Sequence, residues 1–192
     1  MTPAEERKLI RRAAAGDRDA AAQCIRAHQA SLYGYLMRLS GRPEVAEDIV
    51  QEAFVRVLTN LDRFDSRFRF STWLFTIARR LYINASEKRA PRFDSDLVEG
   101  REGGRCAPEG RPLADERRAL ARDSLNAALQ RLAPDQREVL VLFHQLSWPI
   151  ALIAQHMDMP EGTVKSHLHR GRRRLRDFLN TDAPDLVEEP WA

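Results

Sequence analysis

The 192-residue sequence has few of the features that mark secreted, membrane-spanning or metal-dependent proteins. Its only two cysteines, Cys24 and Cys106, are too few for a disulfide framework or a cysteine-rich metal site, so a reducing compartment is expected. No apolar run approaches the length of a membrane span, and the charged N-terminus lacks the apolar segment of a signal peptide. We therefore expect a cytoplasmic protein that does not insert into membranes.

The sequence also lacks the alternating apolar pattern of β-strands, and apolar residues recur instead at spacings of three and four. This pattern predicts an all-α fold in which Cys24 is an ordinary core residue. In the N-terminal half, prolines and small polar residues predict helix starts at Pro3, Asp17, Pro43 and Ser71.

Helical periodicity is missing between about residues 90 and 112, where glycine and proline interrupt a polar stretch. We interpret this stretch as a flexible linker between two small helical domains, so that neither domain positions the other in the free protein. The expected division is a first domain at 1–89, a linker at 90–114, a second domain at 115–180 and an acidic tail at 181–192.

The last helical segment contains no acidic residue between Lys165 and Arg176, although the net charge of the whole chain is only +3. One face of this helix is an apolar stripe formed by Val164, Leu168, Gly171, Leu175 and Leu179. The other face is cationic and rich in hydrogen-bonding groups, which suits the major groove of DNA. A solvated basic helix is the alternative.

A short turn joins this basic helix to a helix expected at about 149–157, and together they form a helix-turn-helix pattern. Asp158 occupies the turn, where a left-handed backbone is useful and aspartate tolerates it. Gly162 and Gly171 would allow close approach of the backbone.

Aromatic residues alternate with arginines between residues 60 and 82. Rings that stack on unstacked bases and cations that follow the backbone are what single-stranded nucleic acid requires. Phe64, Phe68 and Phe70 precede the expected cap at Ser71 in a loop-like stretch, where full burial is harder. Burial of these rings in the core is an equally strong interpretation at this stage.

The expected third helix carries acidic and amide side chains opposite its apolar stripe: Glu44, Glu47, Asp48, Gln51 and Glu52. Carboxylates in pairs can bind a metal ion, but no histidine or cysteine lies near them in sequence. We favour a protein-docking surface.

These features occur together in bacterial sigma factors, and the sequence resembles the extracytoplasmic-function (ECF) group. The strings that carry the resemblance are AEDIVQEAF at 46–54, FSTWLFTIA at 70–78 and GTVKSHLHR at 162–170. The resemblance implies a sigma-2 domain followed by a sigma-4 domain. It also implies three partners: core RNA polymerase (its β′ clamp helices and β flap), promoter DNA and, in many family members, an anti-sigma factor. Whether an anti-sigma factor holds this chain inactive is left open.

The resemblance assigns roles to three groups of residues. Contacts to the −35-type element are implied for Thr163, Lys165, Ser166, His167, Arg170 and Arg173. Contacts to the melted −10-type element are implied for Phe64, Phe68, Trp73, Arg80 and Asn84. Docking on polymerase is implied for Asp48, Gln51 and Glu52. No catalytic residue, metal site or cofactor is expected.

The sequence departs from the family at Pro149, where a serine-like cap is usual, and at Ala151 and Leu152, where acidic residues are common. The second departure predicts either an extra protein contact or better packing against Phe143 or Trp148. Two other functions stay open. One is a stand-alone helix-turn-helix regulator, and the other is a Mg²⁺-dependent nucleic-acid enzyme that uses the carboxylates of the third helix.

Overall fold

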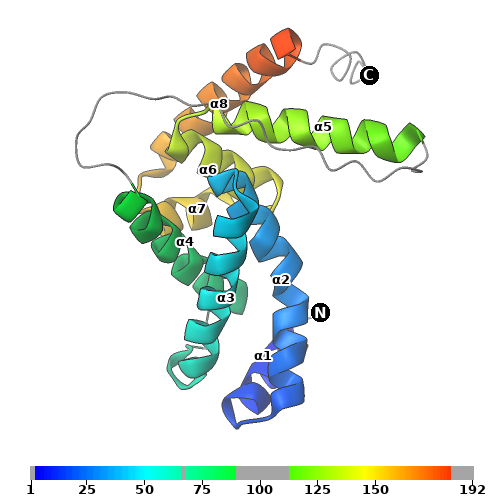
Figure 1. Cartoon of the computed structure of the whole chain (residues 1–192). Helices are drawn as coiled ribbons and strands as arrows, with labels where there is room; N and C mark the ends of the chain where they lie inside the picture. Colours follow the sequence, from blue (N-terminus) through cyan, green and yellow to red (C-terminus); the bar gives the residue numbers. More distant parts are fainter. Residues whose placement is uncertain (1–2, 66–67, 90–112, 183–192) are drawn as a thin grey trace.

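The computed structural model describes residues 3–65, 68–89 and 113–182, and within them it contains α-helices, one short 3-10 helix and no strand. The all-α expectation is therefore confirmed (Figure 1). The elements are α1 (Pro3–Ala14), α2 (Arg18–Ser40), α3 (Pro43–Thr59), η1 (Leu61–Arg63), α4 (Phe70–Arg89), α5 (Leu113–Gln130), α6 (Pro134–His144), α7 (Ile150–Met157) and α8 (Glu161–Asp182). Residues 90–112 of the linker expected at 90–114, with Cys106, and the tail beyond 182 lie outside the described residues.

The first helical unit, α1–α4, is built around α2. Asp17 caps the start of α2, where its side chain accepts a hydrogen bond from the Ala20 backbone N–H at 3.0 Å. Gly41 ends the helix with a left-handed backbone (φ 66°), which glycine adopts without steric cost. Cys24 is fully buried beneath α1, as its apolar surroundings in the sequence predict.

The start of α4 differs from the prediction. Ser71 was expected to cap this helix, but the helix begins at Phe70, and the Trp73 N–H bonds to the Arg69 carbonyl at 3.3 Å. The reason is that the Phe70 ring is buried, with 1% exposed, which fixes its backbone in the first helical turn. Packing has outweighed the capping preference of serine.

The second unit, α5–α8, contains the expected helix-turn-helix at α7 and α8. Asp158 ends α7 with a left-handed backbone (φ 53°, ψ 50°), as predicted. A Cβ atom at Gly171 would lie 3.0 Å from Leu140 Cδ1, so this glycine does permit close packing of α8 on α6. A Cβ atom at Gly162 would meet nothing within 4 Å, so the described part of the chain makes no such close approach there.

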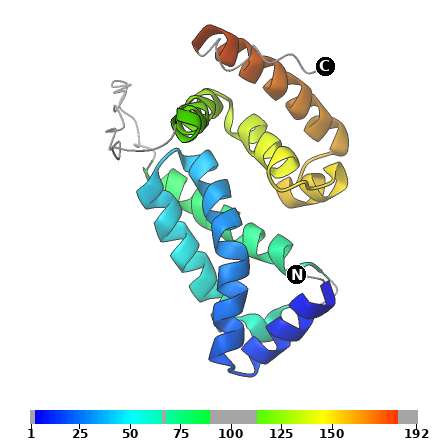
Figure 2. The same ribbon diagram turned by 90° about the vertical axis from the view of Figure 1, so that its right-hand side faces the viewer.

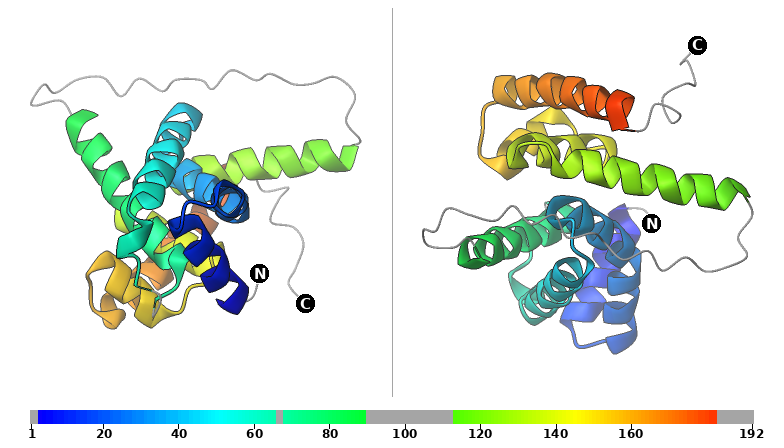
Figure 3. Two further views of the ribbon diagram at one scale, coloured as in Figure 1. Left: turned by 90° about the horizontal axis from the view of Figure 1, so that it is seen from below. Right: turned by 45° about the horizontal axis from the view of Figure 1, so that its top comes forward.

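The two units contact each other, with α2 lying against α5 and α6 (Figures 2 and 3). This differs from the expectation that neither domain positions the other. Hydrogen bonds cross the contact, including one from the Tyr35 hydroxyl on α2 to the Glu138 carboxylate on α6 at 2.6 Å. Such long-range contacts have no signature in the local periodicity from which the domains were predicted.

Candidate nucleic-acid interface

The outer face of α8 carries positive charge from its second turn to its middle. Lys165, Arg170 and Arg173 on this face are exposed, whereas Thr163 and His167 are half-buried. Ser166 is also half-buried, and its hydroxyl donates to the Gly162 carbonyl at 2.9 Å. The apolar stripe faces inward as predicted, since Val164 and Leu168 are buried against the other helices of the unit. The three exposed cations are thus the members of the predicted set that are free to meet DNA.

Two arginines that the sequence places on the same cationic face have a different role in the structure. Arg172 Nε donates to His144 Nε2 at 3.1 Å, and its guanidinium lies 5.2 Å from the Phe143 ring centroid. Arg174 donates to Gln136 Oε1 at 3.2 Å. Both bind α8 to α6, a contact that charge patterning alone does not reveal.

The acidic residues of α3 form one exposed surface. Asp48, Gln51 and Glu52 are all exposed and lie within about one turn of each other, and we call them the docking face. Glu52 also pairs with Arg56, whose Nε lies 2.6 Å from Glu52 Oε1. An exposed pair one turn apart contributes only a few tenths of a kcal/mol, so Glu52 is free to exchange Arg56 for another partner.

The aromatic segment divides between core and surface. Phe70 is buried, and the half-buried Phe64 and Trp73 pack on it with ring centroids 5.6 Å and 6.0 Å away. Phe68 is different, because 59% of it is exposed. The core interpretation therefore holds for Phe70, while Phe68 has a ring free for stacking.

Two further residues predicted to contact the melted strand lie on α4. Arg80 is exposed one turn after Thr76, and the exposed Asn84 follows one turn later. Arg80, Phe64, Phe68 and Trp73 all line a groove of about 1260 Å³ between α4 and α7. Four of the five residues predicted for the −10-type element thus share one groove.

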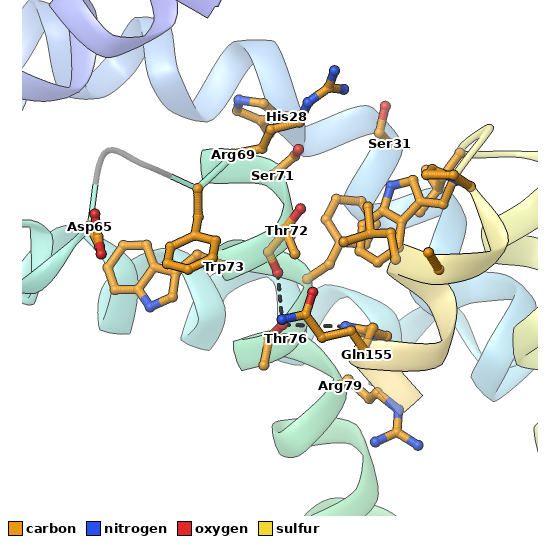
Figure 4. A pocket seen from close by; sticks show the side chains of 18 of the residues that line it. His28, Ser31, Asp65, Arg69, Ser71, Thr72, Trp73, Thr76, Arg79 and Gln155 are labelled. Atoms are coloured by element: carbon orange, nitrogen blue, oxygen red, sulfur yellow. Dashed lines mark hydrogen bonds between the residues drawn. The ribbon is translucent and has the colours of Figure 1, made fainter. Parts of the chain in front are cut away.

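The opposite wall of this groove belongs to the helix-turn-helix (Figure 4). Ala151 and Leu152, the apolar departures from the family pattern, line it together with Gln155. Thr76 Oγ1 and His156 Nδ1 are only 3.3 Å apart, so α7 and α4 are in direct contact. The apolar pair therefore faces the first unit, and Pro149 precedes α7 without a side-chain cap.

Metal-binding clusters and membrane-spanning helices are both absent from the described part of the chain. No group of three or more histidine, cysteine, aspartate or glutamate side chains there could hold a metal ion. No helix among the same residues has the length and apolar character needed to cross a membrane.

Comparisons with known proteins agree with these features. A family model for Sigma-70 region 2 matches residues 24–92, and one for Sigma-70, region 4 matches residues 122–175. The ECF RNA polymerase sigma factor SigW of Bacillus subtilis (strain 168) is 34% identical over 181 residues, which are 90% of this chain and 96% of SigW. The ECF RNA polymerase sigma factor SigL of Mycobacterium tuberculosis is 35% identical over 150 residues, which are 78% of this chain and 82% of SigL.

Solved structures share the fold. CnrH in complex with the cytosolic domain of CnrY matches with a TM-score of 0.68 and 24% identity, over 93% of this chain and 99% of that one. The sigma factor RpoE in complex with the anti-sigma factor NepR from Bartonella quintana matches with a TM-score of 0.64 and 24% identity, over 84% of this chain and 97% of that one.

The chain is therefore a sigma-70-type factor, a subunit that binds core RNA polymerase and directs promoter-specific initiation of transcription. Within that class it belongs to the ECF group of sigma factors. The stand-alone regulator is not favoured by these comparisons.

Proposed function

We propose that the three surfaces described above divide the work of this sigma factor. The first domain (1–89) docks on core polymerase and holds the melted −10-type element, and the second (115–180) reads the −35-type element. The segment at 90–114 joins them, and residues 181–192 form an acidic tail. The exposed docking face on α3 is the observation that carries the proposal, because a protein that only bound duplex DNA would have no use for it.

Contacts to DNA follow from exposure and position. Lys165 and Arg170 lie near the N-terminal end of α8, which in helix-turn-helix proteins approaches the base edges. Arg173, one turn nearer the C-terminus than His169, is placed for a phosphate. Thr163, Ser166 and His167, which are half-buried, support these contacts through shorter side chains.

Contacts to the melted strand come from the exposed end of the aromatic segment. Phe68 offers a ring for a flipped base, Arg80 and Asn84 offer charge and hydrogen bonds, and Phe64 and Trp73 form the wall behind them. The protein contributes binding and no catalysis of its own, and it acts where core polymerase acts, in the cytoplasm. An anti-sigma factor is a further partner that we propose, because RpoE of Bartonella quintana was solved with one.

The docking face is tested by reversing its charge. Asp48→Lys with Glu52→Lys should abolish co-purification with core polymerase, since both carboxylates would become like charges toward a cationic partner. Folding should survive, because both side chains are exposed. The matched control is Glu87→Lys with Asp123→Lys, which makes the same change of net charge at exposed sites away from α3. Assembly of the first variant at wild-type affinity would refute the proposal.

A further inference from the structure

A histidine and a carboxylate meet between the first two helices. The side chain of His28 on α2 is 13% exposed and that of Glu6 on α1 is 17% exposed, and His28 Nε2 lies 3.2 Å from Glu6 Oε1. The Glu6 carboxylate also lies near the buried Cys24, because burial raises the pKa of this thiol to about 11 and the charge of Glu6 adds to the rise. Glu6 therefore points into the unit, whereas the other charged side chains of α1 are exposed.

This pair ties α1 to α2. A carboxylate that is largely removed from water is costly unless a donor or a positive charge compensates it. The imidazole of His28 can do so in either charge state, since a neutral ring with its proton on Nε2 donates and a protonated ring adds charge. None of the residues assigned above to DNA or polymerase lies on α1, so those surfaces do not account for the pair.

The His28 ring also contacts the aromatic segment. It packs on the Phe70 ring of α4 with centroids 5.3 Å apart and an angle of 50° between the two planes. Phe70 packs in turn on Phe64 and Trp73, whose rings are themselves 5.3 Å apart. We call His28, Phe64, Phe70 and Trp73 the ring cluster. Within it, His28 is the member that belongs to α2 and is joined to α1 through Glu6.

The ring cluster holds the attachment points of the exposed Phe68. Phe64 and Phe70 stand on either side of Phe68 in the sequence, and their ring centroids are 5.6 Å apart. The Phe68 backbone N–H donates to the Asp65 carbonyl at 3.0 Å. A short segment whose two ends are fixed by packed rings has few conformations left, so the cluster determines where the Phe68 ring lies. His28 and Phe68 line the same groove (Figure 4).

We propose that His28, held in place by Glu6, is a positioning residue for capture of the melted strand. It fixes Phe70 and thereby the place of the Phe68 ring in the groove, and it acts through Phe70 and not by contact with a base. An apolar side chain of similar size would fill the same space but would have no tie to α1. The inference rests on the function proposed for the aromatic segment and deepens it, because it names residues outside that segment on which base stacking depends.

A variant without the polar pair tests this role. Glu6→Leu with His28→Leu removes both polar groups and leaves no unpaired charge, so urea titration should give a free energy of unfolding near the wild-type value. Holoenzyme formed with this double-leucine variant should bind a promoter whose −10-type element is already unpaired roughly tenfold more weakly, which is about the value of one stacked base. Fluorescence anisotropy with labelled promoter DNA gives the dissociation constant.

A double-mutant cycle separates positioning from general support. Phe68→Ala alone should weaken binding of the unpaired strand by a similar factor. Added to the double-leucine variant, it should change binding by less than about twofold, because a displaced ring has already lost its contact. Arg80→Ala is the matched comparison, since Arg80 lines the same groove but lies outside the ring cluster. Its effect should multiply with that of the double-leucine variant.

Wild-type binding by the double-leucine variant would overturn the inference, and so would effects of this variant and Phe68→Ala that multiply. Non-additivity at Arg80 as well would overturn it too, because the pair would then support the whole unit. Phe68→Ala without effect in the wild-type background would refute the function proposed for the segment, and this inference with it. If the leucines unfold the chain, His28→Gln enters the same cycle, because its amide can donate to Glu6 while the ring is missing from Phe70.

Discussion

Single residues on α8 separate reading of DNA from attachment of the helix. Arg170→Ala removes an exposed cation near the N-terminal end, and a lost bidentate base contact should cost about 1–3 kcal/mol of discrimination. Transcription from promoters with single base changes in the −35-type element measures this. Arg174→Ala is the control, because Arg174 donates to Gln136 and should leave discrimination intact. If base changes affect the Arg170 variant and the wild type alike, Arg170 contacts phosphate.

The aromatic segment makes a second prediction at this scale. Phe68→Ala should leave the free energy of unfolding within about 0.5 kcal/mol of the wild-type value, because Phe68 is mostly exposed, but it should reduce permanganate-reactive, opened DNA. Phe70→Ala should instead lower the free energy of unfolding by about 3–5 kcal/mol, since its ring is buried. Urea titrations separate the two. A large stability loss in the Phe68 variant would show that its ring belongs to the core.

Which individual residues could be predicted depended on how local their determinants are. Cys24 and Asp158 were predicted correctly, because the apolar pattern and the tolerance of aspartate for a left-handed backbone are local properties. Ser71 was predicted wrongly, because burial of the adjacent Phe70 decided where α4 starts. The positions of Arg172 and Arg174 toward α6 depend on tertiary packing and were missed.

At the scale of elements, the packing of α8 on α6 makes a prediction with opposite signs at two glycines. Gly171→Ala adds a Cβ atom 3.0 Å from the buried Leu140 side chain, and the overpacking should outweigh the gain in helix propensity, for a net loss of roughly 1–2 kcal/mol. Gly162→Ala meets open space and should stabilise the protein by up to about 1 kcal/mol. Thermal unfolding of both variants checks this. Equal changes in melting temperature, in the same direction for both variants, would contradict the close approach of Gly171 to Leu140.

Elements were the most predictable level of this molecule. The starts of α1 and α3 at prolines follow from the fixed φ of that residue, and the helix-turn-helix follows from the apolar stripe and Asp158. These signals act within a few residues along the chain. The roles assigned to individual residues of the three surfaces remain predictions.

At the scale of the whole molecule, the contact between the units should depend on pH. Burial favours the neutral form of Glu138, but the neighbouring His156, the Tyr35 hydroxyl and the charge of Arg79 together lower the pKa of its carboxyl below the ordinary 4.5. When the units separate, the carboxyl loses Tyr35 and Arg79 and gains water, so its pKa moves toward the ordinary 4.5 while His156 of its own unit stays nearby. The contribution of Glu138 to the contact between the units is therefore fully present above the ordinary value and is lost as the pH falls through the lowered pKa.

Scattering measured between pH 7 and pH 3 should show the radius of gyration increasing only at the acidic end, below the ordinary pKa of 4.5. The Glu138→Gln variant has no titrating carboxyl at this position, so its radius of gyration should vary less over the same pH range. Helicity is followed in parallel, because protonation of other carboxylates can unfold the chain. Identical pH profiles for the two proteins would exclude Glu138 as the titrating group.

Contacts across the whole molecule were the least predictable. Tyr35 and Glu138 are 103 positions apart, and Arg38 and Gln145 are 107 apart, so no periodicity or spacing connects them. From the sequence alone, the Glu138 carboxylate on α6 would be interpreted as one more surface charge. Its burial becomes apparent only when α2 and α4 are placed against it.

The hydrogen bond between Tyr35 and Glu138 also bears on how this sequence can change. Loss of the Tyr35 hydroxyl removes one donor from a buried carboxylate, which should cost about 1.5–3 kcal/mol. Substitutions at these two positions should therefore be tolerated together more readily than singly, although 103 positions separate them in the chain.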